Sequence, residues 1–211
     1  MIRFYYGSGS PFAWRVQLVL EEKNIPYEPV LLSFSAGDTR KPEYLAISPH
    51  GKVPAMTDDD LVLYESQAIV EYLEERHPTP PLMPKDAAER ALVRIEELEC
   101  TIYLFEAFRV VGQQMFFTPP EQRDEKTLAE RKADVHAQIV RLEARARERG
   151  GQFIAGNHLT RADLAWLPFV EISGRAKIAF DQAQTPWLLE WRERMRQRAS
   201  YERSYPPHWR K

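Results

Sequence analysis

A proline-rich segment between Thr79 and Pro84 divides the sequence into two parts with different patterns. It holds three prolines in six residues, and such a stretch favours neither helix nor strand. We therefore predict a linker over residues 79–85, between a first domain at 1–78 and a second at 86–211. The part before the linker holds seven basic and twelve acidic side chains, whereas the rest of the chain, linker included, holds 22 and 19.

Strand and helix signals alternate in the first part. β-rich runs lie at residues 2–6, 27–32, 54–57 and 61–63, and helical apolar spacing lies at 11–23 and 66–76. We predict the order strand, helix, strand, short helix, strand, strand, helix. A βαβ unit followed by a hairpin and a helix forms a small mixed sheet covered by helices, so the first part belongs to the α/β class.

The second part has helical patterns and almost no strand signal. Helices are predicted near residues 86–116, 160–175 and 186–198, with a further long helix between the first two. That long helix has one apolar stripe: Leu128, Val135, Ile139, Leu142 and Ala146. We therefore predict an all-α second domain.

Composition excludes several classes of function. With 29 basic and 31 acidic residues, the chain lacks the basic excess of a nucleic-acid-binding protein. It has no apolar run of the length needed to cross a membrane. Its one cysteine, Cys100, allows neither an intrachain disulfide nor a cysteine-rich zinc site and suits a reducing, cytoplasmic setting. The five histidines are isolated from one another, so no metal site is predicted.

The sequence S-P-F-A-W-R-V at 10–16 lies where the first strand gives way to the first helix. Ser10 suits the N-cap and Pro11 the first helical position, and helix stability alone explains both residues. The same geometry also favours an anion, because a helix N-terminus carries a partial positive charge. A thiolate placed there would have a lowered pKa, and a hydroxyl donor would lower it further.

Two further motifs have similar double interpretations. In G-K-V-P-A at 51–55, Pro54 suits the start of a strand, or it follows a cis bond that turns the backbone of Val53 outward to pair with an extended peptide. In Y-E-S-Q-A-I at 64–69, Glu65 and Ser66 suit a helix start. They equally suit a bound ammonium and carboxylate.

Together the three motifs resemble the thioredoxin-like domain of cytosolic glutathione transferases. The order of the motifs, their spacing and the helical second part extend that resemblance over nearly the whole chain. It implies a cis Val53–Pro54 bond, with the Val53 backbone pairing with glutathione. It also implies that Glu65 and Ser66 bind the γ-glutamyl end, and that Lys52 contacts the glycyl carboxylate. Glutathione would be a co-substrate, with no metal.

The catalytic position resembles the serine-type classes theta, phi and zeta, in which a serine hydrogen-bonds the thiolate. That role falls on Ser10. The pattern is also similar to an omega-class motif, with serine in place of the cysteine. Because a serine cannot form a mixed disulfide, thiol-transfer chemistry of the omega kind is not expected. Tyr5 and Tyr6 are rivals, because tyrosine-type classes activate the thiol from the end of the first strand, and Tyr6 is the main one; Ser8 or backbone groups are further alternatives. Relatives often have a histidine at the position of Thr39, and Arg40 is a candidate replacement.

In the second part, T-R-A-D at 160–163 matches a signature of the same family. Thr160 is predicted to cap a helix and Asp163 to return a hydrogen bond, which is a structural role. The resemblance also implies an apolar acceptor pocket, for which Phe12, Phe108 and Trp166 are candidates.

The resemblance therefore predicts an enzyme that adds glutathione thiolate to a small, largely apolar electrophile. Two alternatives are a zeta-like glutathione-dependent isomerase or dehalogenase, and a non-catalytic binding module with the same fold. A homodimer is expected, as is usual in such a family.

Overall fold

The computed structural model describes residues 1–210, whose contacts divide them into two compact units. The first unit combines Met1–Leu82 with the segment from Arg196 onward, and the second unit is Met83–Met195. The boundary after Leu82 falls inside the predicted linker. The sequence interpretation placed the last segment in the helical domain; the structure groups it with the first unit, because it packs along that unit's first helix.

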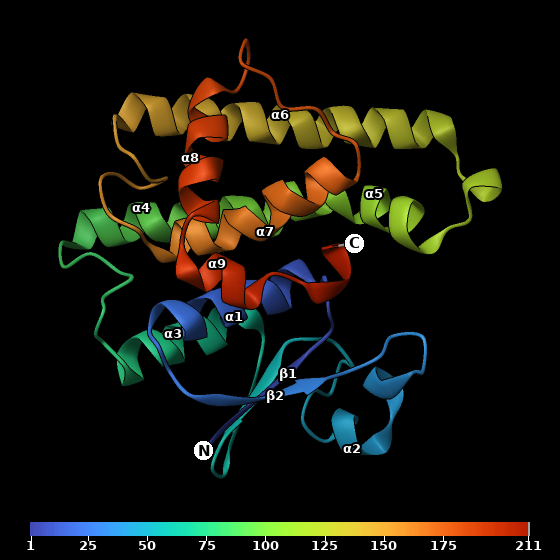
Figure 1. Cartoon of the computed structure of the whole chain (residues 1–211), viewed down its shortest axis with the longest axis vertical. Helices are drawn as coiled ribbons and strands as arrows, with labels where there is room; N and C mark the ends of the chain where they lie inside the picture. The colour runs from blue at the N-terminus through green and yellow to red at the C-terminus, as the bar shows by residue number, and fades with distance from the viewer. Residues whose placement is uncertain (211) are drawn as a thin grey trace. The chain divides into compact units, whose positions relative to one another are not determined.

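The first unit has the predicted order of elements. They are β1 (Ile2–Tyr6), α1 (Pro11–Glu22), β2 (Tyr27–Leu31), α2 (Pro42–Leu45), β3 (Ala55–Asp58), β4 (Leu61–Tyr64) and α3 (Ser66–Arg76), with α9 (Ala199–Ser204) added from the C-terminal segment (Figure 1). A 3-10 turn, Asp38–Arg40, precedes α2. The helix α3 has the predicted bounds, since its apolar residues follow a clear helical spacing.

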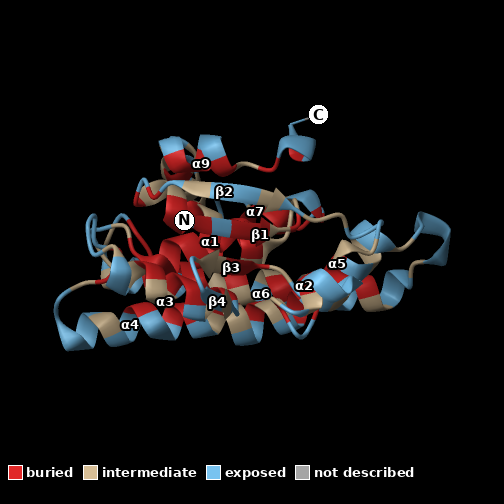
Figure 2. Ribbon diagram, turned by 90° about the horizontal axis from the view of Figure 1, so that it is seen from below, coloured by how far each residue is buried: buried red, intermediate tan, exposed pale blue. Residues whose placement is uncertain are grey.

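The four strands form one mixed sheet in the order β2-β1-β3-β4. β1 runs parallel to β2 and antiparallel to β3, and β3 and β4 form the predicted hairpin. Side chains alternate between the two faces along β1. Phe4 is fully buried, whereas its neighbour Tyr5 points to the other face and packs with Tyr44 of α2 and Ala55 of β3. The helices α1 and α3 pack on each other, and their buried residues appear red in Figure 2.

The second unit is helical, as predicted. Its elements are α4 (Ala87–Leu98), a π-helical segment (Glu99–Leu104), α5 (Phe105–Phe117), α6 (Glu125–Arg149), α7 (Arg161–Arg175) and α8 (Pro186–Arg196), which ends at the unit boundary. The predicted apolar stripe of α6 is confirmed: its five members have exposed fractions of 3% or less. None of the helices within residues 1–210 is long and apolar enough to cross a membrane.

Buried charges join the helices of the second unit. Glu96 of α4 is fully buried and accepts hydrogen bonds from Arg145 at 2.8 and 2.9 Å and from Arg149 at 2.7 Å, both in α6. Arg161 at the start of α7 pairs with Glu97 at 2.9 Å. Both carboxylates are compensated by guanidinium groups, which is what burial of a charge requires.

Candidate functional site

The three sequence motifs meet at one end of the sheet. Tyr5 near the end of β1 pairs with Ala55 at the start of β3, and Ala55 pairs with Tyr64 at the end of β4. Because β3 runs antiparallel to both neighbours, the segment after β1, the segment before β3 and the segment after β4 emerge together. The sheet pairing thus assembles a candidate site from segments that are separate in the chain, the first and last of which, at Ser10 and Ser66, lie 56 positions apart.

Ser10 is the N-cap of α1, as predicted, and Pro11 occupies the first turn. The half-buried Ser10 accepts a hydrogen bond from the Ala13 N–H through Oγ, at 3.4 Å, which is long for such a bond. Its own N–H donates to the Gly7 carbonyl at 3.0 Å, which closes a tight turn after β1. The hydroxyl is therefore held at a helix N-terminus by a weak cap, and its proton is free to be donated to an anion there.

The two tyrosines of β1 point to opposite faces of the sheet. Tyr5 is buried at 7% exposure in the cluster with Tyr44. Tyr6 is half-buried and stacks on Phe4, with ring centroids 5.5 Å apart. Burial leaves Tyr5 poorly placed to meet a ligand, so Tyr6 stays the rival to Ser10.

The segment before β3 presents a fixed backbone. The Val53–Pro54 bond is cis, which confirms the sharper of the two sequence interpretations. The Lys52 carbonyl accepts hydrogen bonds from the Tyr44 hydroxyl at 2.6 Å and from Ser48 Oγ at 2.8 Å. Burial raises the pKa of Tyr44 to about 12, so this hydroxyl remains a donor at neutral pH. Two donors thus hold the backbone next to Val53, the residue predicted to pair with a peptide.

Glu65 adopts a strained backbone conformation at the start of α3. Its φ is +68° and its ψ is 113°, a region that residues with a Cβ rarely occupy. Its side chain is exposed and does not cap α3, whereas the neighbouring Ser66 is buried at 6% exposure. A strained residue of this kind persists only where surrounding structure imposes it, and such residues cluster at functional sites.

Arg40 lies beside the 51–53 segment. A Cβ added at Gly51 would lie 2.6 Å from the Thr39 carbonyl oxygen and 3.1 Å from Arg40 Nη1, so only glycine allows this approach. Arg40 and Lys52 are both exposed, while Thr39 is buried. Two cationic side chains are therefore available near the Val53 backbone, and Thr39 itself is poorly exposed for a ligand.

The acceptor-pocket candidates belong to different units. Phe12, in the first unit, is half-buried beneath the Arg15 guanidinium, 5.4 Å from its ring centroid. Phe108, in the second unit, is 4% exposed and packs edge-on against Phe169. Trp166, also in the second unit, is 1% exposed. Its indole N–H donates to the Glu96 carbonyl at 2.9 Å, which is the environment of a core residue.

The remaining candidates have structural surroundings. Cys100 is fully buried, and its thiol lies 3.3 Å from the Ala165 carbonyl. Thr160 and Asp163 form the predicted capping box of α7. The carboxylate of Asp163 is fully buried and accepts from the N–H groups of Ile154, Thr160 and Trp191 at 2.8–2.9 Å. Burial raises the pKa of Asp163 against the opposing effect of these donors.

Two residues near the site escaped sequence reasoning. The ring of Phe34 covers Gly7, since a Cβ added there would lie 2.2 Å from it, and Phe34 is 46% exposed. His208 lies 2.7 Å from Ser8 through Nδ1, although the two residues are 200 positions apart. Neither residue belongs to a local sequence pattern. In the sequence, Phe34 is only an aromatic residue in a loop and His208 is only an isolated histidine.

Comparison with known families supplies the context for this site. The model of the glutathione S-transferase N-terminal domain matches residues 4–81, and that of the C-terminal domain matches residues 105–199. Both matches agree with the family that the motifs indicated.

Individual relatives extend the match over almost the entire chain. Glutathione S-transferase A from Pleuronectes platessa is 30% identical over 207 residues, covering 97% of this chain and 91% of its own. The maleylacetoacetate isomerase of Pseudomonas aeruginosa is 44% identical over 93 residues, 43% of each chain. The crystal structure of the theta class glutathione S-transferase from the citrus canker pathogen Xanthomonas axonopodis pv. citri, with glutathione bound, matches with a TM-score of 0.87 at 26% identity, covering 97% of this chain and 96% of that one. The chain therefore belongs to the glutathione S-transferase family.

Proposed function

We propose that this protein transfers the thiolate of glutathione to a small, largely apolar electrophile. The observation that carries the proposal is the convergence of three groups at one end of the sheet. These are the Ser10 hydroxyl at the start of α1, the fixed backbone at Val53, and the Glu65–Ser66 pair at the start of α3.

The chain's own groups match the chemical parts of glutathione. The Val53 N–H and C=O would pair with the cysteinyl backbone as a neighbouring strand does. The N-terminus of α3 with Ser66 would hold the γ-glutamyl carboxylate, and Glu65 would meet the ammonium group. Lys52 and Arg40 would neutralise the glycyl carboxylate. The structure with glutathione bound to the theta-class relative supports this assignment of the co-substrate.

Ser10 would supply the chemistry by stabilising the thiolate. Lowering a thiol pKa from about 8.5 to about 6.5 requires roughly 2.7 kcal/mol of preference for the anion. A hydrogen bond to a charged sulfur contributes about 1.5–3 kcal/mol, and a helix N-terminus about 0.3–1 kcal/mol. Their sum reaches the required value, so a neutral serine at the start of α1 is sufficient.

For the acceptor side, Phe12 of the first unit is the candidate that we propose, whereas Phe108 and Trp166 of the second unit have the surroundings of core residues. Phe12 is the most accessible of the three, because the other two are almost fully buried. A substitution such as Phe12→Ala is expected to raise KM for an apolar acceptor more than KM for glutathione. A larger increase in KM for glutathione than in KM for the acceptor would exclude Phe12 from the acceptor site.

A second candidate reaction is glutathione-dependent isomerisation, or dehalogenation by the same initial attack. The similarity to a maleylacetoacetate isomerase over 93 residues favours this alternative. In isomerisation glutathione adds to the substrate and is then released, so free thiol is not consumed. Measuring free thiol during turnover separates it from conjugation, which consumes one thiol per product, and halide release without net consumption of thiol identifies a dehalogenation that regenerates glutathione.

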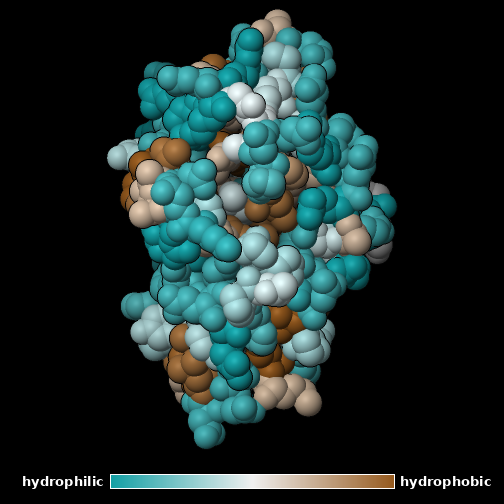
Figure 3. Space-filling model, turned by 90° about the vertical axis from the view of Figure 1, so that its left-hand side faces the viewer, coloured by the Kyte–Doolittle hydropathy of each residue, from teal (hydrophilic) through white to brown (hydrophobic). Residues whose placement is uncertain are grey.

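A homodimer is part of the proposal. One face of the molecule is largely hydrophilic with separate hydrophobic patches (Figure 3). Exposed apolar residues follow one another at helical spacing along α4 and its continuation: Leu92, Ile95, Leu98 and Ile102 have exposed fractions of 38–52%. Such a stripe on the exposed face of α4 suits a second copy of the chain. Light scattering is expected to give twice the 24.6 kDa of one chain, and a mass of one chain would refute the dimer.

Calorimetric titration tests the proposed function most simply. Glutathione is expected to bind, and Ser66→Ala and Glu65→Gln are each expected to weaken binding by about tenfold, the effect of losing one hydrogen bond to a charged group. Absence of binding to the wild-type protein would favour a non-catalytic module.

We also propose a cytoplasmic location, because a chain with a single cysteine suits a reducing compartment.

A further inference from the structure

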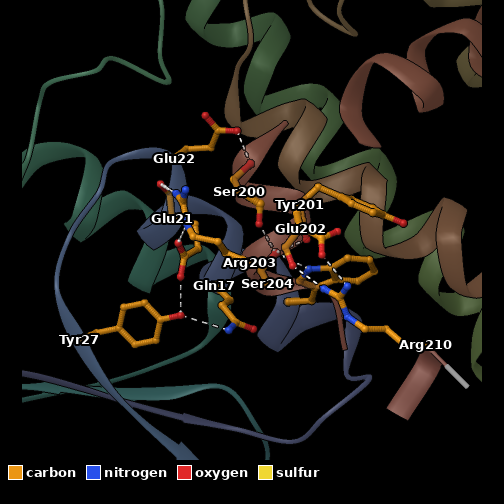
Figure 4. Close-up of polar contacts among 11 residues, drawn as sticks. Gln17, Glu21, Glu22, Tyr27, Ser200, Tyr201, Glu202, Arg203, Ser204 and Arg210 are labelled. Atoms are coloured by element: carbon orange, nitrogen blue, oxygen red, sulfur yellow. Dashed lines mark hydrogen bonds and ion pairs between the residues drawn. The ribbon is translucent and has the colours of Figure 1, made fainter. Parts of the chain in front are cut away.

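The C-terminal tail, residues 205–210, returns to the first unit after α9. It includes a 3-10 turn, Pro207–Trp209, and it follows a helix that lies along α1 (Figure 4). None of the sequence motifs accounts for this return. Its contacts connect it to the loop that carries Ser10.

Trp14 provides the anchor for the tail. It lies within the S-P-F-A-W-R-V motif, is 2% exposed, and donates through its indole N–H to Ser204 Oγ at 2.8 Å. The ring centroids of Tyr205 and Trp209 lie 5.7 and 5.5 Å from that of Trp14, both edge-on. Aromatic contacts of this kind fix orientation as well as burying apolar area.

Charged groups hold the preceding helix to α1. Arg198 forms a two-pronged ion pair with Glu22 at 2.6 and 2.8 Å, and Ser200 donates to the same carboxylate at 2.5 Å. Arg203 donates to Glu21 at 2.5 Å. These contacts, of which those of Ser200 with Glu22 and of Arg203 with Glu21 appear in Figure 4, fix the point from which the tail departs.

The tail then reaches the turn before Ser10. His208 Nδ1 lies 2.7 Å from Ser8 Oγ. A Cβ added at Gly9 would lie 3.1 Å from His208 Cε1 and 3.2 Å from Trp209 Cζ2, and Gly9 has a φ of +83°. The tail therefore covers the backbone of one residue of the turn and hydrogen-bonds the side chain of another, immediately before Ser10.

We propose that His208 is a positioning residue for the thiolate partner. By holding Ser8 and covering Gly9, it fixes the turn from which the Ser10 hydroxyl is aimed. Ser10 needs this support, because its own cap bond to Ala13 is long, at 3.4 Å. This inference rests on the proposed function, and it adds a contribution of the C-terminal tail to the site.

The expected size of the effect follows from the cost of misplacing a catalytic group. A displacement of about 1 Å can reduce a rate by about a hundredfold. Loss of one of several contacts to the turn is expected to produce part of that effect, about tenfold. Binding of glutathione to Val53 and Glu65 does not involve the tail, so KM for glutathione should change little.

The experiment compares four variants of the full-length protein: His208→Ala, Ser8→Ala, the double variant, and His208→Asn. For each, kcat, KM for glutathione and the pKa of the bound thiol are measured, the last from thiolate absorbance against pH. Either single alanine variant should lower kcat about tenfold and raise the thiol pKa. The double variant should be no worse than His208→Ala, because both single variants remove the same hydrogen bond and only His208→Ala also uncovers Gly9. His208→Asn should restore much of the loss, since an amide can occupy the position of Nδ1.

Controls distinguish the ways in which the inference can fail. His158→Ala replaces an exposed histidine of the second unit and should leave every measurement unchanged. Ser8→Ala removes the contact without altering the tail, so it tests the inference even if a tail variant folds poorly. Unchanged kcat and thiol pKa in Ser8→Ala and His208→Ala, or additive effects in the double variant, would overturn the positioning role. When that happens, Ser10→Ala shows what else has failed. If Ser10→Ala also leaves the thiol pKa unchanged, the proposed function and the positioning role of His208 both fail. If Ser10→Ala raises that pKa, only the positioning role fails.

Discussion

Asp163 and Glu65 are both acidic residues at helix N-termini, and they have opposite surroundings. Asp163 at the start of α7 is fully buried and accepts hydrogen bonds from three N–H groups. Glu65 at the start of α3 is exposed, has a strained backbone and does not cap its helix. Both sequences suit a helix start, yet one carboxylate is satisfied by the protein and the other is exposed. The difference separates a folding device from the residue that we propose binds glutathione.

The largest expected effect is on stability, at Asp163. Asp163→Ala would leave buried N–H groups unpaired at about 1–3 kcal/mol each, so we expect a loss of about 4 kcal/mol or more in the free energy of unfolding. The matched variant Glu65→Ala should change that free energy by no more than about 0.5 kcal/mol in either direction, as is usual for an exposed site. Urea unfolding measures both free energies. Similar losses of stability in the two variants would contradict the distinction between Asp163 and Glu65.

The next largest effect is on turnover, at Ser10. Ser10→Ala removes a hydrogen bond to a charged sulfur worth about 1.5–3 kcal/mol, so kcat should fall about 10- to 100-fold at neutral pH while glutathione binding changes little. Ser10→Thr, which keeps the hydroxyl, should retain more activity than Ser10→Ala. Steady-state kinetics provide the measurement, and full activity of Ser10→Ala would direct attention to Tyr6→Phe.

In the first unit, the carboxylate of Glu22 has hydrogen-bond donors within the protein, unlike the exposed carboxylate of Glu65. Burial opposes its ionisation, but Arg198 and Ser200 outweigh burial and hold the pKa of Glu22 below its ordinary value of 4.5. Its stabilising contribution is therefore fully present above about pH 4.5 and is lost as the pH falls through the lower folded-state pKa.

We expect Glu22→Gln to cost about 1–2 kcal/mol at pH 7 and less at pH 3, where the wild-type carboxyl gains protons. Unfolding experiments at the two pH values measure the difference. A cost that is the same at both would show that the Glu22 charge does not hold the C-terminal segment.

The smallest expected effect is a gain in stability at the strained residue. Glu65→Gly should relieve the strain at φ +68°, which is worth about 1–3 kcal/mol, but it also gives the unfolded chain more freedom at about 0.5–1 kcal/mol. The net change should be a stabilisation of about 1 kcal/mol, accompanied by weaker glutathione binding. Thermal unfolding and calorimetry on one preparation measure both, with Asp59→Gly, at another positive φ, as the control that should leave binding unchanged.

The features that were predicted from local sequence patterns are those that depend on residues close together in the chain. The bounds of α3, the β3–β4 hairpin and the capping box at Thr160 and Asp163 each depend on residues a few positions apart. The motif residues Ser10 and Val53 were predicted through the family that they resemble, and sheet pairing brings their segments to one end.

Contacts between distant segments were not predictable in this way. The return of the C-terminal tail depends on Trp14 meeting Trp209, and no periodicity connects residues that far apart. The apolar residues of α4 were identified as helical, but their exposure depends on which neighbours the fold supplies. The strain at Glu65 likewise arises from how β4 joins α3, which the residue type does not reveal.

A crystal structure of the complex with glutathione tests the central claim most directly. We predict that the sulfur lies within about 3.5 Å of Ser10 Oγ, that the Val53 backbone pairs with the cysteinyl residue, and that Glu65 and Ser66 contact the γ-glutamyl end. A sulfur nearest to the Tyr6 hydroxyl, with Ser10 engaged only as the cap of α1, would contradict it.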